Sequence, residues 1–158
     1  MRKDSITINR IIDANINRAK EGLRVCEEIT RFILESRRLS FQFKRIRHKI
    51  EFTLKGLPVN FSLLKGRDSL KDVGRTIHAF ELKRRNFKDV FFANLQRVKE
   101  SVRVLEEFAK LKSHKPGGNG LASNSQSHKA ALYFKKIRYE LYEIEKTAAK
   151  KISSLRYP

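Results

Sequence analysis

Apolar residues recur at steps of three and four over four long segments of the chain. The four stripes are Ile12, Ile16, Ala19, Leu23 and Cys26; Leu39, Phe43, Ile46, Ile50 and Leu54; Phe91, Leu95, Val98, Val102 and Leu105; and Phe134, Ile137, Leu141, Ile144, Ala148, Ile152 and Leu155. This spacing places the apolar residues on one face of an α-helix. Each such face must be buried against other helices, so the pattern predicts an all-α fold.

The first and third segments are related copies. Residues 14–28 align with residues 93–107 at an offset of 79, and nine of the fifteen positions are identical. Residues 43–48 align with residues 134–139 at an offset of 91, so the second copy carries an insertion of twelve residues. We therefore predict a four-helix bundle made from a duplicated helix pair, with an approximate internal two-fold axis.

The 158 residues fit a single domain. We place the first repeat at about 8–55, a central connector at 56–88 and the second repeat at about 89–155. Residues 76–84 are expected to add a short helix to the connector. A segment rich in Gly, Ser and Asn predicts a flexible loop at 113–129.

Composition narrows the class of protein. Hydrophobic residues make up 40% of the chain and charged residues 34%. No apolar run is long enough to span a membrane. Cys26 is the only cysteine, so an internal disulfide is impossible, and no secretory signal is visible near the N-terminus. These features predict a cytoplasmic protein without a membrane partner.

The chain is strongly basic, with 36 Lys and Arg against 17 Asp and Glu and a net charge of +19. Such an excess suits a polyanionic partner such as nucleic acid. It also suits an enzyme that holds several phosphate groups, and it can simply keep a protein in solution. The charge by itself leaves these alternatives open.

Both copies place an Asn within the apolar stripe, an Arg three residues later and a Glu three residues after that. These residues are Asn15, Arg18 and Glu21 in the first copy and Asn94, Arg97 and Glu100 in the second. If the copies meet near the two-fold axis, these side chains could bind an anionic ligand. Alternatively, each Asn fixes the helix register and Arg18 pairs with Glu21 on the surface.

Gly22 and Ser101 are small residues at matching positions, which would let two helices approach closely. The outer charges of the same helices are expected to form a solvated face of intrahelical ion pairs. They are Arg24, Glu27, Glu28, Arg103, Glu106 and Glu107.

The connector contains a cluster of chemically active residues between Gly66 and Arg75. Asp68 and Asp72 could serve a magnesium ion bound to nucleotide, which takes one or two carboxylates in addition to phosphate oxygens. Arg67 and the glycines, Gly74 among them, could approach phosphate. The alternative is a surface turn in which Asp68 caps a helix, and spacing alone slightly favours the turn.

The second helices of the two copies also match at Arg47-His48 and Arg138-Tyr139. Arg47 and His48 could contact a phosphate, although an ordinary basic helix face explains the same residues. The sequence contains no phosphate-binding loop of the G-x-x-x-x-G-K-[ST] type and no glycine-rich dinucleotide motif.

The assembled motifs resemble a known family. The run from Arg10 to Val25, RIIDANINRAKEGLRV, is similar to the N-terminal signature of a small domain often fused ahead of thiamin-phosphate synthase. Further pieces match in order: 39–48, 67–68, 72–74, 93–107 and 134–142. The family is a hydroxymethylpyrimidine-phosphate kinase, and no synthase barrel follows here, so we expect a stand-alone member.

The resemblance implies phosphorylation of hydroxymethylpyrimidine phosphate to the diphosphate, with ATP as co-substrate and Mg²⁺ as cofactor. We assign catalysis to Arg18, Arg97 and Asp72, and the metal to Asp68 and Asp72. The assigned substrate-binding residues are Asn15, Glu21, Asn94, Glu100, Arg47, His48, Arg67, Gly74 and Arg138. Two alternatives remain: a basic helical module that binds nucleic acid, and a non-catalytic partner of thiamin-phosphate synthase. The sequence also leaves open whether copies of the chain associate.

Overall fold

The computed structural model describes residues 3–55, 63–64, 66–67, 72, 74, 83–111 and 121–155. Its long helices are α1 (Lys3–Glu28), α2 (Arg37–Lys55), α4 (Phe87–Leu111) and α5 (Leu121–Ser154). A short π-helix, η1 (Ile29–Ile33), follows α1 directly. The predicted all-α bundle of four helices is therefore confirmed, although α5 begins inside the predicted loop.

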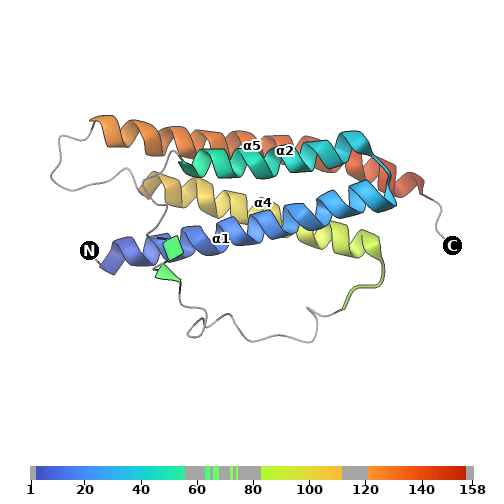
Figure 1. Ribbon diagram of the computed structural model, residues 1–158, viewed down its shortest axis with the longest axis horizontal. Coiled ribbons are helices and arrows are strands. Elements are labelled where there is room, and N and C mark those ends of the chain that lie inside the picture. The colour runs from blue at the N-terminus through green and yellow to red at the C-terminus, as the bar shows by residue number, and fades with distance from the viewer. Residues whose placement is uncertain are drawn as a thin grey trace.

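The helices form two layers, with α1 beside α4 and α2 beside α5 (Figure 1). Helix α1 runs antiparallel to both α2 and α4, and α5 runs antiparallel to both of its own neighbours. Each helix packs against two others, so the four apolar stripes meet along the centre of the bundle.

The core is built from the four stripes that the sequence predicts. Its largest fully buried side chains include Phe43, Phe91 and Phe134, each with no exposed surface. The rings of Phe43 and Phe91 meet edge to face with centroids 5.9 Å apart, which joins α2 to α4 across the bundle. Helix periodicity thus locates the core without further information.

Helices α1 and α4 approach each other closely at Gly22. A Cβ atom placed on Gly22 would lie 2.9 Å from the carbonyl oxygen of Asn94 and 2.7 Å from Cγ2 of Val98. Ser101, the matching residue of the second copy, is 3% exposed. The predicted close approach of the two copies is therefore present, and it requires glycine on the α1 side.

The corner between α1 and α2 depends on a widened helical turn. The amide of Leu34 donates to the carbonyl of Ile29 at 3.0 Å, and the amide of Ser36 donates to that of Thr30 at 2.9 Å. Glu35 has a φ of 46°, in the left-handed region. That region costs a non-glycine residue roughly 1–2 kcal/mol. This corner turns the chain back so that α2 lies against α1.

The prediction of a flexible loop at 113–129 is wrong for residues 121–129, which belong to α5. Ser127, Ala130 and Ala131 are buried against the bundle, and this packing extends the helix beyond its apolar stripe. Residues 112–120 lie outside the described part of the chain, as do most of the residues predicted to form a helix at 76–84. No helix among the described residues has the length and apolarity needed to cross a bilayer.

Gly22→Ala should destabilise the protein even though alanine favours a helix by about 1 kcal/mol. The added methyl group collides with the backbone of α4, and such overpacking costs about 1–3 kcal/mol. We expect a net loss of about 1 kcal/mol in the free energy of unfolding, measured by urea denaturation.

Ser101→Ala is the matched control, because this position already accommodates a Cβ atom. It should change the unfolding free energy by less than Gly22→Ala does. Equal stability of Gly22→Ala and the wild type would mean that α1 and α4 do not meet as closely as described.

The single thiol should report on unfolding of the core. Cys26 is fully buried, and this burial, followed by the charge of Glu145, raises the pKa of the thiol from 9.0 to about 12. A thiol reagent near pH 8 should therefore react with the protein only in denaturant. Above pH 9 the unfolded thiol ionises while the buried one stays neutral, so Cys26 should lower stability as pH rises towards 12. Rapid reaction of the native protein would contradict this packing.

Candidate functional site

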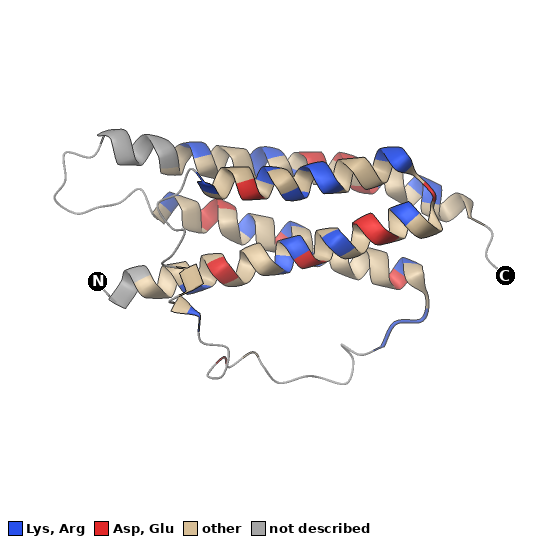
Figure 2. Cartoon of the chain, in the orientation of Figure 1, with Lys and Arg blue, Asp and Glu red and all other residues tan. Residues whose placement is uncertain are grey.

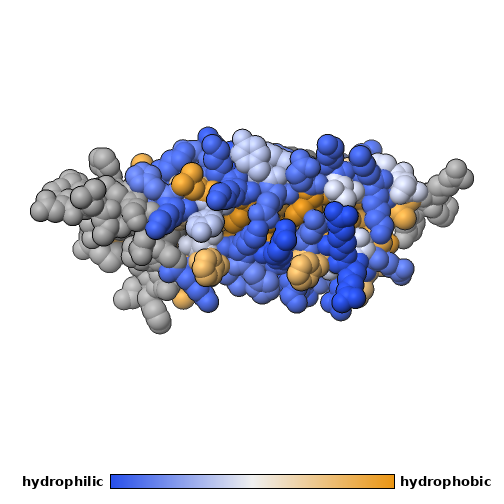
Figure 3. Space-filling view, turned by 90° about the horizontal axis from the view of Figure 1, so that it is seen from above, coloured by the Kyte–Doolittle hydropathy of each residue, from blue (hydrophilic) through white to orange (hydrophobic). Residues whose placement is uncertain are grey.

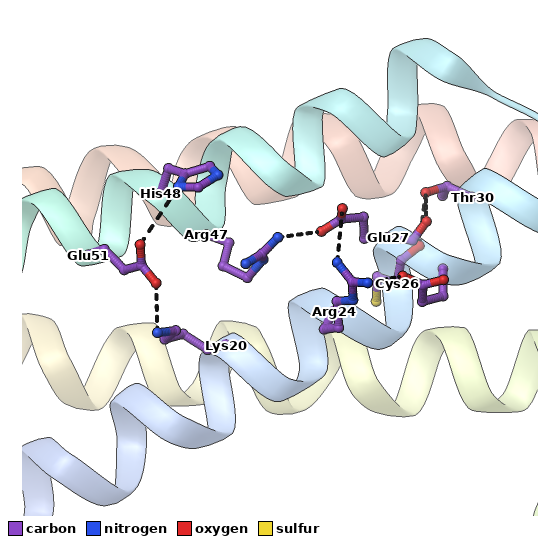
Figure 4. A network of polar contacts seen from close by, with 9 residues as sticks. Lys20, Arg24, Cys26, Glu27, Thr30, Arg47, His48 and Glu51 are labelled. Carbon is purple, nitrogen blue, oxygen red and sulfur yellow. Dashed lines mark hydrogen bonds and ion pairs between the residues drawn. The ribbon is translucent and has the colours of Figure 1, made fainter.

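A buried carboxylate joins α1 to α2. Glu27 is 5% exposed, and its carboxylate lies 3.5 Å from Nη1 of Arg24 and 3.1 Å from Nη2 of Arg47 (Figure 4). Thr30, one turn further, donates its hydroxyl to the Cys26 carbonyl at 2.9 Å. Glu27 therefore holds one cation from its own helix and one from the next.

The second copy contains the same arrangement between α4 and α5. Glu106 is 3% exposed; it lies 2.9 Å from Nη1 of Arg103 and accepts a hydrogen bond from Nε of Arg138 at 3.1 Å. These residues match those of the first copy at the offsets of 79 and 91. The recurrence supports the predicted duplication.

The prediction that these outer charges form a solvated face is wrong for Glu27 and Glu106. Their carboxylates lie below the surface because the second helix of each pair covers them. Glu28 and Glu107, one residue later, do lie near the surface and pair with Arg24 and Arg103 at 2.8 and 2.9 Å.

The two copies differ in the carboxylate that pairs with the matching lysines Lys20 and Lys99. In the first, Lys20 lies 2.7 Å from Glu51, and His48 lies 3.7 Å from the same carboxylate. Hydrogen bonding to Lys20 lowers the pKa of Glu51. The position that matches Glu51 is Tyr142, which has no carboxylate to offer.

A groove lies beside the network of the second copy. Lys99 pairs instead with Glu145 at 2.7 Å, and Arg138 donates to the Tyr142 hydroxyl at 3.0 Å. The groove measures about 510 Å³ and is lined by Gln96, Lys99, Glu100, Arg103, Val104, Arg138 and Tyr142. The hydrogen bond to Tyr142, and then that to Glu106, raise the pKa of Arg138, which therefore stays charged.

The two stripe amides bond within their own helices. Nδ2 of Asn15 donates to the Ile11 carbonyl at 2.9 Å, and Nδ2 of Asn94 donates to the Val90 carbonyl at 2.8 Å. Asn15 is buried and Asn94 is half-buried. Both amides thus bond one turn back along their helices, as a packing residue would, and the predicted ligand contact remains a prediction.

Arg18 and Arg97 are both exposed, and neither makes a hydrogen bond or ion pair with another described residue. The expected surface pair between Arg18 and Glu21, both of them described, is absent. Glu100 accepts a hydrogen bond from Gln96 at 2.8 Å. Because Gly22 contacts Asn94 and Val98 on an antiparallel neighbour, Arg18 and Arg97 lie within about one helical turn of the same level.

The connector is attached to α1 through Arg67. Its guanidinium binds the carboxylate of Asp13 through two hydrogen bonds, of 2.7 and 2.8 Å. Asp13 is 8% exposed. A Cβ atom on Gly66 would lie 3.3 Å from the Ile6 carbonyl oxygen. Arg67 therefore holds the connector in place, a contact that spacing along the sequence did not indicate.

Part of the predicted magnesium loop is described. Oδ1 of Asp72 accepts a hydrogen bond from the amide of Gly74 at 2.9 Å, and both residues are exposed. This is the local turn that Asp residues commonly form. Asp68 lies outside the described residues, and the described part of the chain contains no cluster of three or more His, Cys, Asp or Glu suited to a metal ion.

Comparison with known proteins identifies the family. The sequence model of the ThiD2 family matches residues 10–147. The chain belongs to the ThiD2 family. The match includes all of α2 and α4 and most of α1 and α5, with both copies of the ion-pair network and the position of Tyr142. No solved structure matches this ThiD2 chain.

The curated relatives are named thiamine-phosphate synthase. The protein of Synechocystis sp. is 38% identical over 140 residues, which are 87% of this chain and 35% of the relative. That of Nostoc punctiforme is 37% identical over 139 residues (87% and 34%), and that of Rhodopirellula baltica is 39% identical over 108 residues (68% and 28%). The chain spans about a third of their length. These matches link it to thiamin biosynthesis.

Replacing the buried carboxylate should destabilise the bundle. Glu106→Gln leaves Arg138 without its anion and Arg103 with Glu107 alone, and loss of charged hydrogen bonds costs about 1.5–3 kcal/mol each in partly buried surroundings. We expect a loss of about 2 kcal/mol or more in the unfolding free energy, and Glu27→Gln should behave alike.

Glu107→Gln is the matched control, since its surface pairs are each worth below about 1 kcal/mol. A Glu106→Gln protein no less stable than Glu107→Gln would show that the buried network does not hold α4 to α5.

Proposed function

We propose that this chain is a kinase that phosphorylates hydroxymethylpyrimidine phosphate to the diphosphate with Mg-ATP. The observation that carries the proposal is the family match over residues 10–147, together with relatives named for thiamin-phosphate synthesis. The relatives with these names are about three times as long as this chain. The kinase step is therefore our inference for the part of those proteins that this chain matches.

The proposed reaction requires no covalent intermediate with the protein. An oxygen of the substrate phosphate attacks the γ-phosphorus of ATP, a new P–O bond forms, and the bond to the β-phosphate oxygen breaks to release ADP. The attacking phosphate is already largely ionised near pH 7, since its second pKa is about 6. Positioning and charge neutralisation therefore dominate catalysis, and arginines suit both tasks.

Two arginines on the described surface make no hydrogen bond or ion pair with another described residue, so their guanidinium groups can bind phosphate. Arg18 and Arg97 are exposed at similar levels of α1 and α4. Glu100 lies one turn after Arg97 and lines the groove that also contains Arg103 and Arg138. We place the substrate phosphate against Arg18 and Arg97, with Glu100 at the boundary between these arginines and the groove.

The other predicted residues take supporting roles in this proposal. Asn15 and Asn94 position the arginines by fixing the register of their helices, and Arg67 holds the connector against α1. Arg47 and His48 belong to the first copy's network, where Arg47 pairs with Glu27 at 3.1 Å and His48 lies 3.7 Å from Glu51.

Magnesium would neutralise charge on the ATP phosphates. An ion bound to nucleotide needs only one or two carboxylates from the protein, and Asp72 is an exposed carboxylate in a glycine-containing turn. This fits a weak site completed by nucleotide oxygens. Asp72 is the described residue that would hold the ion, and Asp68 is its proposed partner.

Arg18→Lys should reduce kcat/KM for hydroxymethylpyrimidine phosphate by about 10-fold or more. Lysine keeps the charge but loses the forked pair of hydrogen bonds, and one charge-assisted bond is worth roughly 1.5–3 kcal/mol. The measurement is steady-state turnover with ATP and magnesium, with thermal melting of the same variant.

Arg38→Lys is the control, because Arg38 is exposed at the start of α2 and away from the proposed site. It should leave kcat/KM unchanged. Absence of diphosphate product with the wild-type protein would overturn the kinase proposal. Normal turnover of Arg18→Lys, with wild-type turnover intact, would remove only the arginine from the site.

A further inference from the structure

Among the four helices, the basic excess is concentrated in one layer of the bundle. Helix α2 carries seven Lys and Arg against one acid, and α5 carries seven against three, so this layer has a net charge of +10. Helix α1 carries five against five and α4 carries five against four, a net charge of +1. The blue residues of α2 and α5 are correspondingly dense in Figure 2.

This layer also exposes aromatic rings among its cations. On α2, steps of four, three and four residues give the outward row Phe41, Arg45, His48 and Phe52. Phe41 is 63% exposed and Phe52 is 71% exposed. On α5, the same steps give Lys129, Tyr133, Lys136 and Glu140, and Tyr133 is 48% exposed.

The two rows border a groove between α2 and α5. It measures about 430 Å³ and is lined by Arg45, His48, Lys49, Phe52, Thr53, Tyr133, Lys136, Ile137 and Glu140. Figure 3 looks down on this layer and shows apolar surface between hydrophilic side chains. The groove thus has an apolar floor, aromatic walls and a basic rim.

The carboxylate of Glu140 in the groove does not neutralise the positive charge of the basic side chains around it. Glu140 pairs with Lys49 at 2.7 Å and with Arg45 at 3.5 Å. Lys136 instead lies over the Tyr133 ring, with its ammonium 5.6 Å from the ring centroid, an arrangement in which the ring face attracts the cation. Three permanent cations therefore face one carboxylate, and Lys136 stands beside an aromatic ring without an ion pair to a described residue.

We propose that the α2/α5 layer binds single-stranded nucleic acid, with unpaired bases stacking on Phe52 and Tyr133 and backbone phosphates meeting the cations. Rows of aromatic rings between basic residues are the physical requirement for such binding. A duplex hides the faces of its bases, and an acidic protein has few planar groups to stack. A single strand matches both features, the charge of the layer and the exposed rings.

This activity does not rest on the proposed kinase reaction. The groove lies between α2 and α5, whereas Arg18 and Arg97 lie on the other layer, and none of Phe52, Tyr133 and Lys136 belongs to the proposed kinase site. Loss of one activity can therefore be measured without loss of the other.

The test is fluorescence anisotropy of the full chain with a labelled single strand of about 20 nucleotides, which exceeds the usual site size. We expect binding that weakens as salt rises from roughly 50 to 200 mM, and Lys136→Gln should reduce the log–log slope by about 0.7. Phe52→Ala should weaken binding by about 5-fold or more, because stacking of one base is worth about that factor.

Heparin, a polyanion without bases, separates stacking from charge: Phe52→Ala should leave its binding unchanged. Phe92→Ala, an exposed ring on α4, and Lys83→Glu, an exposed charge before α4, are the matched controls. They should keep single-strand affinity, and kinase turnover should be equal in Phe52→Ala and the wild type.

Several results would overturn the proposal. Equal single-strand affinity of Phe52→Ala and the wild type would do so, as would an equal loss of single-strand affinity in the two control variants. Tighter binding of a matched duplex would also contradict it. So would binding to phosphatidylserine vesicles without binding to the single strand. Competition by free ATP at concentrations equivalent to those of the strand would also overturn it, since it would assign the groove to a mononucleotide.

Discussion

The contact between α1 and α4 at Gly22 is the constraint on which the rest of the bundle depends. A single missing Cβ lets α1 meet the backbone of Asn94, and this distance fixes how far apart the two helix pairs can lie. Any larger side chain would separate the stripes that bury Leu23 and Val98. Because each helix pair has one apolar stripe per helix, neither pair could bury its core surface without the other.

Within each pair, a buried carboxylate fixes the register that apolar packing leaves loose. Apolar stripes tolerate sliding by one turn, whereas Glu27 must meet Arg47 and Glu106 must meet Arg138. Removing charges from water is costly and returns little net stability. The register of the two helices, rather than the strength of the ion pairs, is the better explanation for finding the same network twice.

The sequence predicted the helices, the core and the close approach because these depend on periodicity and residue size. It failed at Glu27 and Glu106, since a helical wheel shows the face of a residue but not the partner helix that covers it. A shared Glu at matching positions could not reveal the burial, because Glu28 and Glu107 also match and lie near the surface. The hydrogen bond between Arg67 and Asp13 joins residues that are 54 positions apart in the sequence. Helical periodicity relates only residues within one helix, so it could not predict this contact. The helical start of α5 also depended on tertiary packing, which overrode the local composition.

The two helix pairs share their packing residues, whereas the proposed kinase would bind two unequal ligands and so needs surfaces that differ. The two helix pairs differ at Tyr142, and the two layers differ in charge. Tyr142 occupies the position that matches Glu51 of the first copy, and it lines a groove beside Arg138. A separate asymmetry lies between the layers, since α2 and α5, one helix from each copy, hold nearly all the basic excess of the four helices. The packing residues are shared by both copies, whereas the groove beside Arg138 and the basic layer are the surfaces available to the proposed ligands.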